Sequence, residues 1–173
     1  MKLKTGSASN SILKLIIQSL VEKCLKISSM SAKKQNHHNS LGVFFLTFNS
    51  EYQPFFQPPS WIIGPVWMVL YTMIAISFSI FLTKINEIDY FAIIVILFLI
   101  QLALNFTWSG VFNSANYLMS SLMILGMVIF TTIYAWLIYE HAPTASKLVW
   151  PYIAWVCFAG IINVAYYLND ITD

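Results

Sequence analysis

Four long apolar stretches dominate the sequence from residue 61 onward. They run approximately over residues 61–83, 90–112, 117–139 and 149–168, and none of them contains a charged side chain. As a helix that rises 1.5 Å per residue, about 20 residues cross the roughly 30 Å hydrocarbon core of a bilayer. The alternating polarity that is typical of membrane strands is missing. The pattern therefore predicts four membrane-spanning helices.

The connections between these stretches are short. They comprise residues 84–89, 113–116 and 140–148, the last of which contains His141 and Pro143. Because short connections make neighbouring helices antiparallel, we expect an all-α membrane protein built as an antiparallel transmembrane helix bundle. None of the loops is long enough to form a soluble catalytic domain.

Residues 1–46 form a basic N-terminal arm with a different pattern. Four charges lie between Lys14 and Lys26, and each would cost about 2.5–3.5 kcal/mol at the centre of a membrane helix. Apolar side chains nevertheless recur there at helical spacing: Leu13, Ile16, Ile17, Leu20, Cys24 and Ile27. An amphipathic helix in the membrane interface is the cheaper state, and a degenerate fifth span is the alternative.

The composition is typical of a membrane protein, and most of the positive charge lies in the N-terminal arm. Apolar residues make up 58% of the chain and charged residues only 9%, against about 25% in soluble domains. Seven of the nine lysines precede residue 35, and arginine is absent. Such an arm indicates a topology signal or contact with anionic lipid, so the expected partner is the bilayer and not nucleic acid. Cys24 and Cys157 give neither a metal-ligand spacing nor a disulfide framework.

Polar and aromatic residues form stripes within three of the apolar stretches. Spacings of three, four and seven residues place each stripe on one helix face. The stripes are Trp67, Tyr71 and Phe78; Gln101, Asn105, Trp108 and Phe112; and Trp155, Ala159, Asn163 and Tyr167. Two interpretations stay open for them, interhelical hydrogen bonding and the lining of a ligand pocket. At the stretch ends an interfacial aromatic belt is expected, formed by Trp61, Trp150 and Tyr152.

A proline-rich segment precedes the first stretch. Residues 53–61 read Gln-Pro-Phe-Phe-Gln-Pro-Pro-Ser-Trp, and the three prolines predict a stiff, extended loop. Such a loop serves as a helix entry, and it could also cap the mouth of a cavity.

Three blocks of the sequence occur together in a recognisable order. They are residues 53–71, residues 101–108 (Gln-Leu-Ala-Leu-Asn-Phe-Thr-Trp) and residues 150–163, which include Trp150-Pro151-Tyr152 and Phe158-Ala159. Together they resemble the TspO/MBR family of tryptophan-rich sensory proteins and mitochondrial translocator proteins. The resemblance implies a family domain at residues 47–173, built as a five-helix bundle that is often a homodimer. It also implies a bacterial inner or mitochondrial outer membrane.

The resemblance implies a ligand class and a set of site residues as well. Members of the family bind porphyrins, haem, sterols and synthetic aromatic compounds, and some bacterial members degrade protoporphyrin in light. Carried over by motif, Trp67 matches the tryptophan assigned to that photochemistry. The ligand-binding residues carried over are Phe48, Pro58, Pro59, Trp67, Gln101, Asn105, Trp108, Trp155, Ala159 and Asn163. No basic residue follows Tyr166 and Tyr167, which makes sterol the less expected ligand.

The residue types within the apolar stretches narrow the function. They include no carboxylate pair, metal cluster or Ser/His pair, so acid–base and hydrolytic catalysis are not expected, and no metal or cofactor is required. We expect binding, and with it transport or sensing, of a flat hydrophobic ligand such as porphyrin or haem. Light-dependent porphyrin breakdown and a ligand-free structural role are the alternatives. A porphyrin's carboxylates would need cations, which we expect at Lys84, Lys147 or the N-terminal arm.

Overall fold

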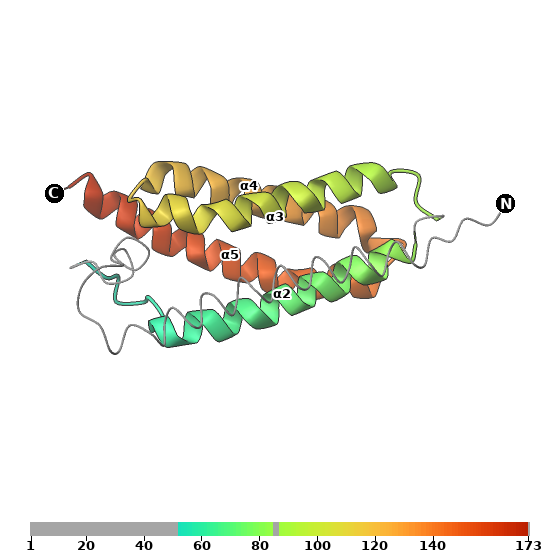
Figure 1. The fold of residues 1–173 in the computed structure, drawn as a ribbon, viewed down its shortest axis with the longest axis horizontal. Coiled ribbons are helices and arrows are strands. Elements are labelled where there is room, and N and C mark those ends of the chain that lie inside the picture. The colour runs from blue at the N-terminus through green and yellow to red at the C-terminus, as the bar shows by residue number, and fades with distance from the viewer. Residues whose placement is uncertain (1–51, 85–86, 173) are drawn as a thin grey trace.

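Four helices account for most of the described chain. The computed structural model describes residues 52–84 and 87–172, and its helices are α2 (Ser60–Leu82), α3 (Phe91–Asn113), α4 (Tyr117–Tyr139) and α5 (Pro143–Asp170). Successive helices run in opposite directions (Figure 1), and all four are long and apolar enough to cross a membrane. The predicted all-α antiparallel transmembrane bundle is confirmed for these residues. The basic arm, with its predicted amphipathic helix, and Phe48 lie outside them.

Large aromatic side chains fill the seam between α2 and α3. α4 packs along both α3 and α5, and α2 packs on α5. Between α2 and α3, Phe78 stacks on Phe98 with ring centroids 4.1 Å apart, and Phe81 stacks on Phe91 at 4.8 Å. Helices in lipid associate through such packing and through interhelical hydrogen bonds. The half of the bundle that contains the end of α2 and the start of α3 is therefore filled by phenylalanine rings.

The last helix begins at Pro143, earlier than the expected limit at residue 149. Proline is favoured in the first turn because its missing N–H would have no partner there. Ser146 Oγ on this turn donates to the carbonyl oxygen of Ala135 on α4 (2.7 Å). The predicted loop over residues 140–148 is therefore wrong from residue 143 onward.

The earlier start of α5 changes the position of Tyr152. This residue lies well inside the helix and is fully buried (0% exposed), so its assignment to the interfacial aromatic belt is wrong. Trp61 and Trp150 are exposed by 71% and 53%, as expected for that belt.

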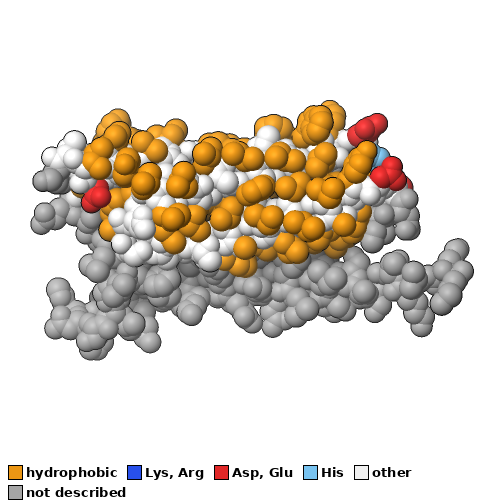
Figure 2. Space-filling model, turned by 90° about the horizontal axis from the view of Figure 1, so that it is seen from above, with side chains coloured by type: hydrophobic (Ala, Val, Ile, Leu, Met, Phe, Trp, Pro, Cys, Tyr) orange, Lys and Arg blue, Asp and Glu red, His pale blue; other side chains and the backbone are white. Residues whose placement is uncertain are grey.

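The outer surface is apolar between two polar ends. Figure 2 shows hydrophobic side chains across the visible face and acidic side chains only toward its two ends. At one end, Lys84 Nζ pairs with Glu87 Oε1 at 3.0 Å. We call this the charged end and define it by residue 84 with residues 87–90 and 140–147. The opposite, loop end contains residues 52–59, 113–116 and 170.

Candidate functional site

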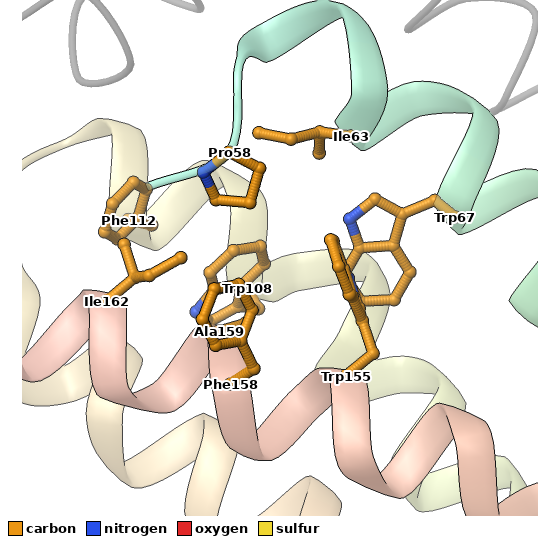
Figure 3. Close-up of a pocket in the computed structure, with 9 residues that line it drawn as sticks. All are labelled: Pro58, Ile63, Trp67, Trp108, Phe112, Trp155, Phe158, Ala159 and Ile162. Atoms are coloured by element: carbon orange, nitrogen blue, oxygen red, sulfur yellow. The ribbon is translucent and has the colours of Figure 1, made fainter. Parts of the chain in front are cut away.

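A small pocket lies between α2, α3 and α5 in the half of the bundle nearest the loop end. The start of α2, the end of α3 and the second half of α5 meet there because successive helices are antiparallel. Each helix contributes one indole, and the rings of Trp67, Trp108 and Trp155 gather around the space (Figure 3). The rest of the lining is apolar and consists of Pro58, Ile63, Phe112, Phe158, Ala159 and Ile162.

The free space between the rings of the pocket is small. Its free volume is about 30 Å³, which holds about one or two water molecules, whereas pockets for drug-sized ligands measure about 300–1,000 Å³. The ring centroid of Trp67 lies 6.5 Å from that of Trp108 and 6.5 Å from that of Trp155. A larger ligand therefore enters only when side chains or the covering loop move aside.

Two hydrogen-bond donors in this lining have no partner. The Nε1 atoms of Trp108 and Trp155 are buried and make no hydrogen bond within the part of the chain that the structure describes. The residue Trp108 is only 9% exposed. A buried donor left unpaired costs about 1–3 kcal/mol.

The two amides of α3 lie deeper than the pocket, in a buried hydrogen-bond network. Tyr71 Oη donates to Asn105 Oδ1 (2.5 Å), and Asn105 Nδ2 donates to Tyr152 Oη (3.1 Å). Tyr152 Oη in turn donates to Gln101 Oε1 (2.9 Å). The ring of Trp67 stacks on Tyr71 at 5.2 Å and meets Tyr152 edge-on at 6.3 Å. The network therefore joins α2, α3 and α5 and forms the floor on which Trp67 rests.

Removing the hydroxyl at the centre of this network should lower stability. Tyr152→Phe breaks two interhelical hydrogen bonds, and each such bond in a membrane protein is worth about 0.6 kcal/mol on average. We expect a loss of about 1 kcal/mol in the free energy of unfolding, measured by thermal or denaturant unfolding in detergent. Tyr139→Phe is the matched control because Tyr139 is exposed at the end of α4. Equal stability of the two variants would contradict the role given to the network.

Asn163 joins α5 to the start of α4. Its amide oxygen accepts from Ser120 Oγ (2.5 Å), and its Nδ2 donates to the carbonyl oxygen of Tyr117 (2.9 Å) and to Ser121 Oγ (2.5 Å). The side chain is fully buried and is not part of the pocket lining. These contacts are those of a residue that holds two helices together.

The proline-rich loop covers the pocket and leads into α2. Tyr166 Oη on α5 donates to Gln57 Oε1 (2.7 Å), and Tyr52 packs edge-on against the Tyr166 ring. The next residue, Pro58, lines the pocket. Pro59 is exposed and stands at the cap position of α2. The loop is thus both the entry of α2 and part of the pocket wall.

The expected ligand residues that the structure describes, all but Phe48, divide into two groups. The structure brings to the pocket Pro58, Trp67, Trp108, Trp155 and Ala159. It places outside the lining Pro59, Gln101, Asn105 and Asn163. The carried-over set lacked four lining residues, Ile63, Phe112, Phe158 and Ile162. Helical spacing from the three pocket tryptophans indicates all four. Ile63 precedes Trp67 by one turn, Phe112 follows Trp108 by one turn, and Phe158 and Ile162 follow Trp155 by one and two turns.

The lysines expected to pair with ligand carboxylates are not at the pocket. Lys84 follows α2, and Lys147 lies near the start of α5, so both belong to the charged end. The expectation that these two lysines meet a pocket ligand is therefore wrong, because the phenylalanine-filled half of the bundle lies between. Among the residues that the structure describes, the charged side chain at the loop end is Asp170, an anion.

Known proteins are similar in sequence to this chain over most of its length. A model of the TspO/MBR family matches residues 25–168, a range that begins inside the predicted basic arm. The tryptophan-rich protein TspO of Archaeoglobus fulgidus is 37% identical over 120 residues, which are 67% of this chain and 74% of that protein. Similarity extends to the translocator protein homolog of Schizosaccharomyces pombe, with 34% identity over 131 residues (70% and 76%), and to the translocator protein of Homo sapiens, with 32% over 116 residues (64% and 67%). The chain is therefore an integral membrane protein that belongs to the TspO/MBR family.

Proposed function

We propose that this protein binds a flat, hydrophobic small molecule of the porphyrin or haem type in the pocket between α2, α3 and α5. The observation that carries the proposal is the convergence of three indoles, from three helices, on one apolar space. Aromatic rings stack favourably on one another, and apolar walls with a few polar groups are typical of small-molecule sites. Transport and sensing both begin with such a binding step.

Binding of a molecule of this size requires the pocket to widen. The half-buried Phe158 and the loop that carries Pro58 both contribute to the wall of the pocket, and we infer that they yield to the ligand. The floor under Trp67 is tied by the hydrogen bonds among Tyr71, Asn105 and Tyr152, and it keeps its shape. The ligand then lies against the indoles and takes the place of the side chains that moved.

The chemistry of the lining favours binding without a chemical step. None of the lining side chains is a carboxylate, histidine or cysteine, and the described residues contain no group of three or more potential metal ligands. Axial ligation of haem iron uses groups such as histidine, cysteine or methionine. Haem would therefore be held through the faces and edge of its ring system.

Removing the indole ring of Trp67 from the pocket lining should weaken porphyrin binding. Trp67→Leu removes a stacking surface, and an aromatic pair is worth about 0.5–1.5 kcal/mol beyond burial, so we expect the Kd for protoporphyrin IX to rise about tenfold. The titration uses purified protein in lipid nanodiscs and follows the porphyrin Soret band, which does not depend on tryptophan emission.

The control for this titration replaces a tryptophan outside the pocket. Trp136 on α4 is 76% exposed, so Trp136→Leu should leave the Kd unchanged. Absence of binding by the unmodified protein, or equal effects of the two substitutions, would contradict the proposed site.

A further inference from the structure

We propose that the proline-rich loop is a lipid anchor, in which the side chain of Phe55 lies in the lipid interface at the loop end of the bundle. The partner of this surface is the bilayer itself. The contact is separate from the pocket between α2, α3 and α5, and it holds whether or not that pocket binds a porphyrin.

A tight turn presents Phe55 at its tip. The backbone N–H of Gln57 donates to the carbonyl oxygen of Pro54 (2.9 Å), so Phe55 and Phe56 are the two central residues of the turn. Pro54 is buried, whereas Phe55 is 98% exposed. Phe56 is half-buried, and its ring meets that of Phe55 edge-on at 5.2 Å. The turn therefore packs against the protein through Pro54 and leaves one aromatic ring outside it.

Helix α5 indicates the depth of this turn in the membrane. The turn is tied to α5 because Tyr166 Oη donates to Gln57 Oε1, and Figure 1 shows the loop at the end of the bundle where α5 finishes. Tyr166 follows the exposed Trp150 of the aromatic belt by 16 residues, which is about 24 Å along a helix axis. The hydrocarbon core is about 30 Å thick, and a tilt of the helix shortens the projected distance further. The turn therefore lies at the level of the second lipid interface and not in the water beyond it.

The residue types around Phe55 fit this level of the membrane. Residues 52–61 contain no charged side chain, and they lead into Trp61, which is 71% exposed at the start of α2. Aromatic side chains gather at membrane interfaces, and phenylalanine and tryptophan are typical of segments that insert among the headgroups. In water the Phe55 ring would forgo the free energy of leaving that solvent. The exposed ring is thus continuous with the lipid-facing surface that Trp61 begins.

A spin label at residue 55 tests which medium surrounds the tip of the turn. The chain has two cysteines, Cys24 and Cys157, so Phe55→Cys is prepared with both of them replaced by serine and is studied in nanodiscs of phosphatidylcholine. Power-saturation EPR compares collisions of the label with oxygen, which concentrates in lipid, and with a water-soluble nickel chelate. We expect the ratio of oxygen to nickel collisions at residue 55 to exceed that at residue 170 by about tenfold, the preference that burial gives an apolar side chain.

Two positions on α5 serve as references for this measurement. Asp170→Cys, in the same cysteine-free chain, lies one turn beyond Tyr166 at an exposed, charged position and reports water. A label on the native Cys157 in Cys24→Ser protein reports lipid, because Cys157 is exposed within an apolar span. Phe55→Cys should unfold at the same temperature as the cysteine-free chain, since Phe55 is almost fully exposed.

Each outcome decides whether Phe55 contacts lipid. Collisions dominated by oxygen, as at Cys157, support the anchor. Collisions dominated by the nickel chelate, as at residue 170, would place the turn in water and overturn it. Low collision rates with both reagents would show that protein covers the tip of the turn, which also overturns the lipid contact. None of these results depends on porphyrin binding, so failure of the anchor and failure of the proposed function are distinguishable.

Discussion

Ala159→Phe should raise the Kd for protoporphyrin IX about 30-fold or more, the largest effect on binding that we expect. The alanine methyl group faces a pocket with only about 30 Å³ of free space, and an added phenyl ring fills it. A ligand must then displace this ring in addition to Phe158 and the loop. Overpacking of a tight interior costs about 1–3 kcal/mol, and each 1.4 kcal/mol changes Kd about tenfold.

The same substitution one and a half turns earlier on α5 provides the control. Ala154 is exposed on the outer surface, so Ala154→Phe adds an equal volume on the face toward lipid and should leave the Kd unchanged. Soret titrations of the two variants give the comparison directly. If Ala159→Phe binds protoporphyrin IX as tightly as Ala154→Phe, the ligand does not occupy this pocket.

Asn163→Leu should cause the largest loss of stability among the substitutions considered. It removes three hydrogen bonds to α4, worth about 0.6 kcal/mol each and thus about 2 kcal/mol together. For a chain of this size the expected fall in Tm is about 4–8 °C. Thermal unfolding in detergent, followed by near-ultraviolet circular dichroism, measures it.

A polar-to-leucine change on the outer surface serves as the control for Asn163→Leu. Thr72 is exposed on α2, and its hydroxyl donates to the carbonyl oxygen of Met68 in the same helix. Thr72→Leu should therefore change the free energy of unfolding by less than about 0.5 kcal/mol. Because Asn163 lies outside the pocket lining, porphyrin affinity should persist in folded Asn163→Leu. A selective loss of affinity with unchanged Tm would make Asn163 a ligand contact instead of a helix-to-helix tie.

The helices were predictable because lipid imposes a simple rule on their sequences. Uninterrupted runs of about 20 uncharged residues have no other stable location in a chain of this size, and three of the four observed helices lie within a residue or two of the expected limits. α5 was different because Lys147 and Pro143 suggested a loop. In the structure, Pro143 begins the helix, and Lys147 forms part of its polar first turns at the charged end.

The distinction between pocket residues and tie residues was not predictable from periodicity. Gln101, Asn105 and Trp108 share one face of α3, so spacing alone assigns them the same environment. Their environments differ because they lie at different distances from the loop end along α3. Trp108 reaches the pocket, whereas Asn105 and Gln101 lie one and two turns further from that end, where tyrosines of α2 and α5 form hydrogen bonds with them. This depth depends on how the three helices are offset along their axes, which hydrophobic periodicity does not encode.

The position of the lysines, in contrast, follows from helix order. In an antiparallel bundle the end of α2 and the start of α5 lie on the same side, opposite the proline-rich loop. Lys84 and Lys147 could therefore have been excluded from a pocket beneath that loop.

The most direct test of a ligand held by indoles inside the bundle uses the indole N–H signals themselves. The chain has six tryptophans: Trp67, Trp108 and Trp155 line the pocket, and Trp61, Trp136 and Trp150 are exposed on the outer surface. In protein labelled with ¹⁵N-tryptophan, the ¹H–¹⁵N spectrum resolves these groups as porphyrin is added. We predict saturable shifts of the three pocket signals with the three surface signals unchanged. Shifts confined to Trp61, Trp136 and Trp150 would show that the ligand lies on the outside of the bundle and would contradict the account.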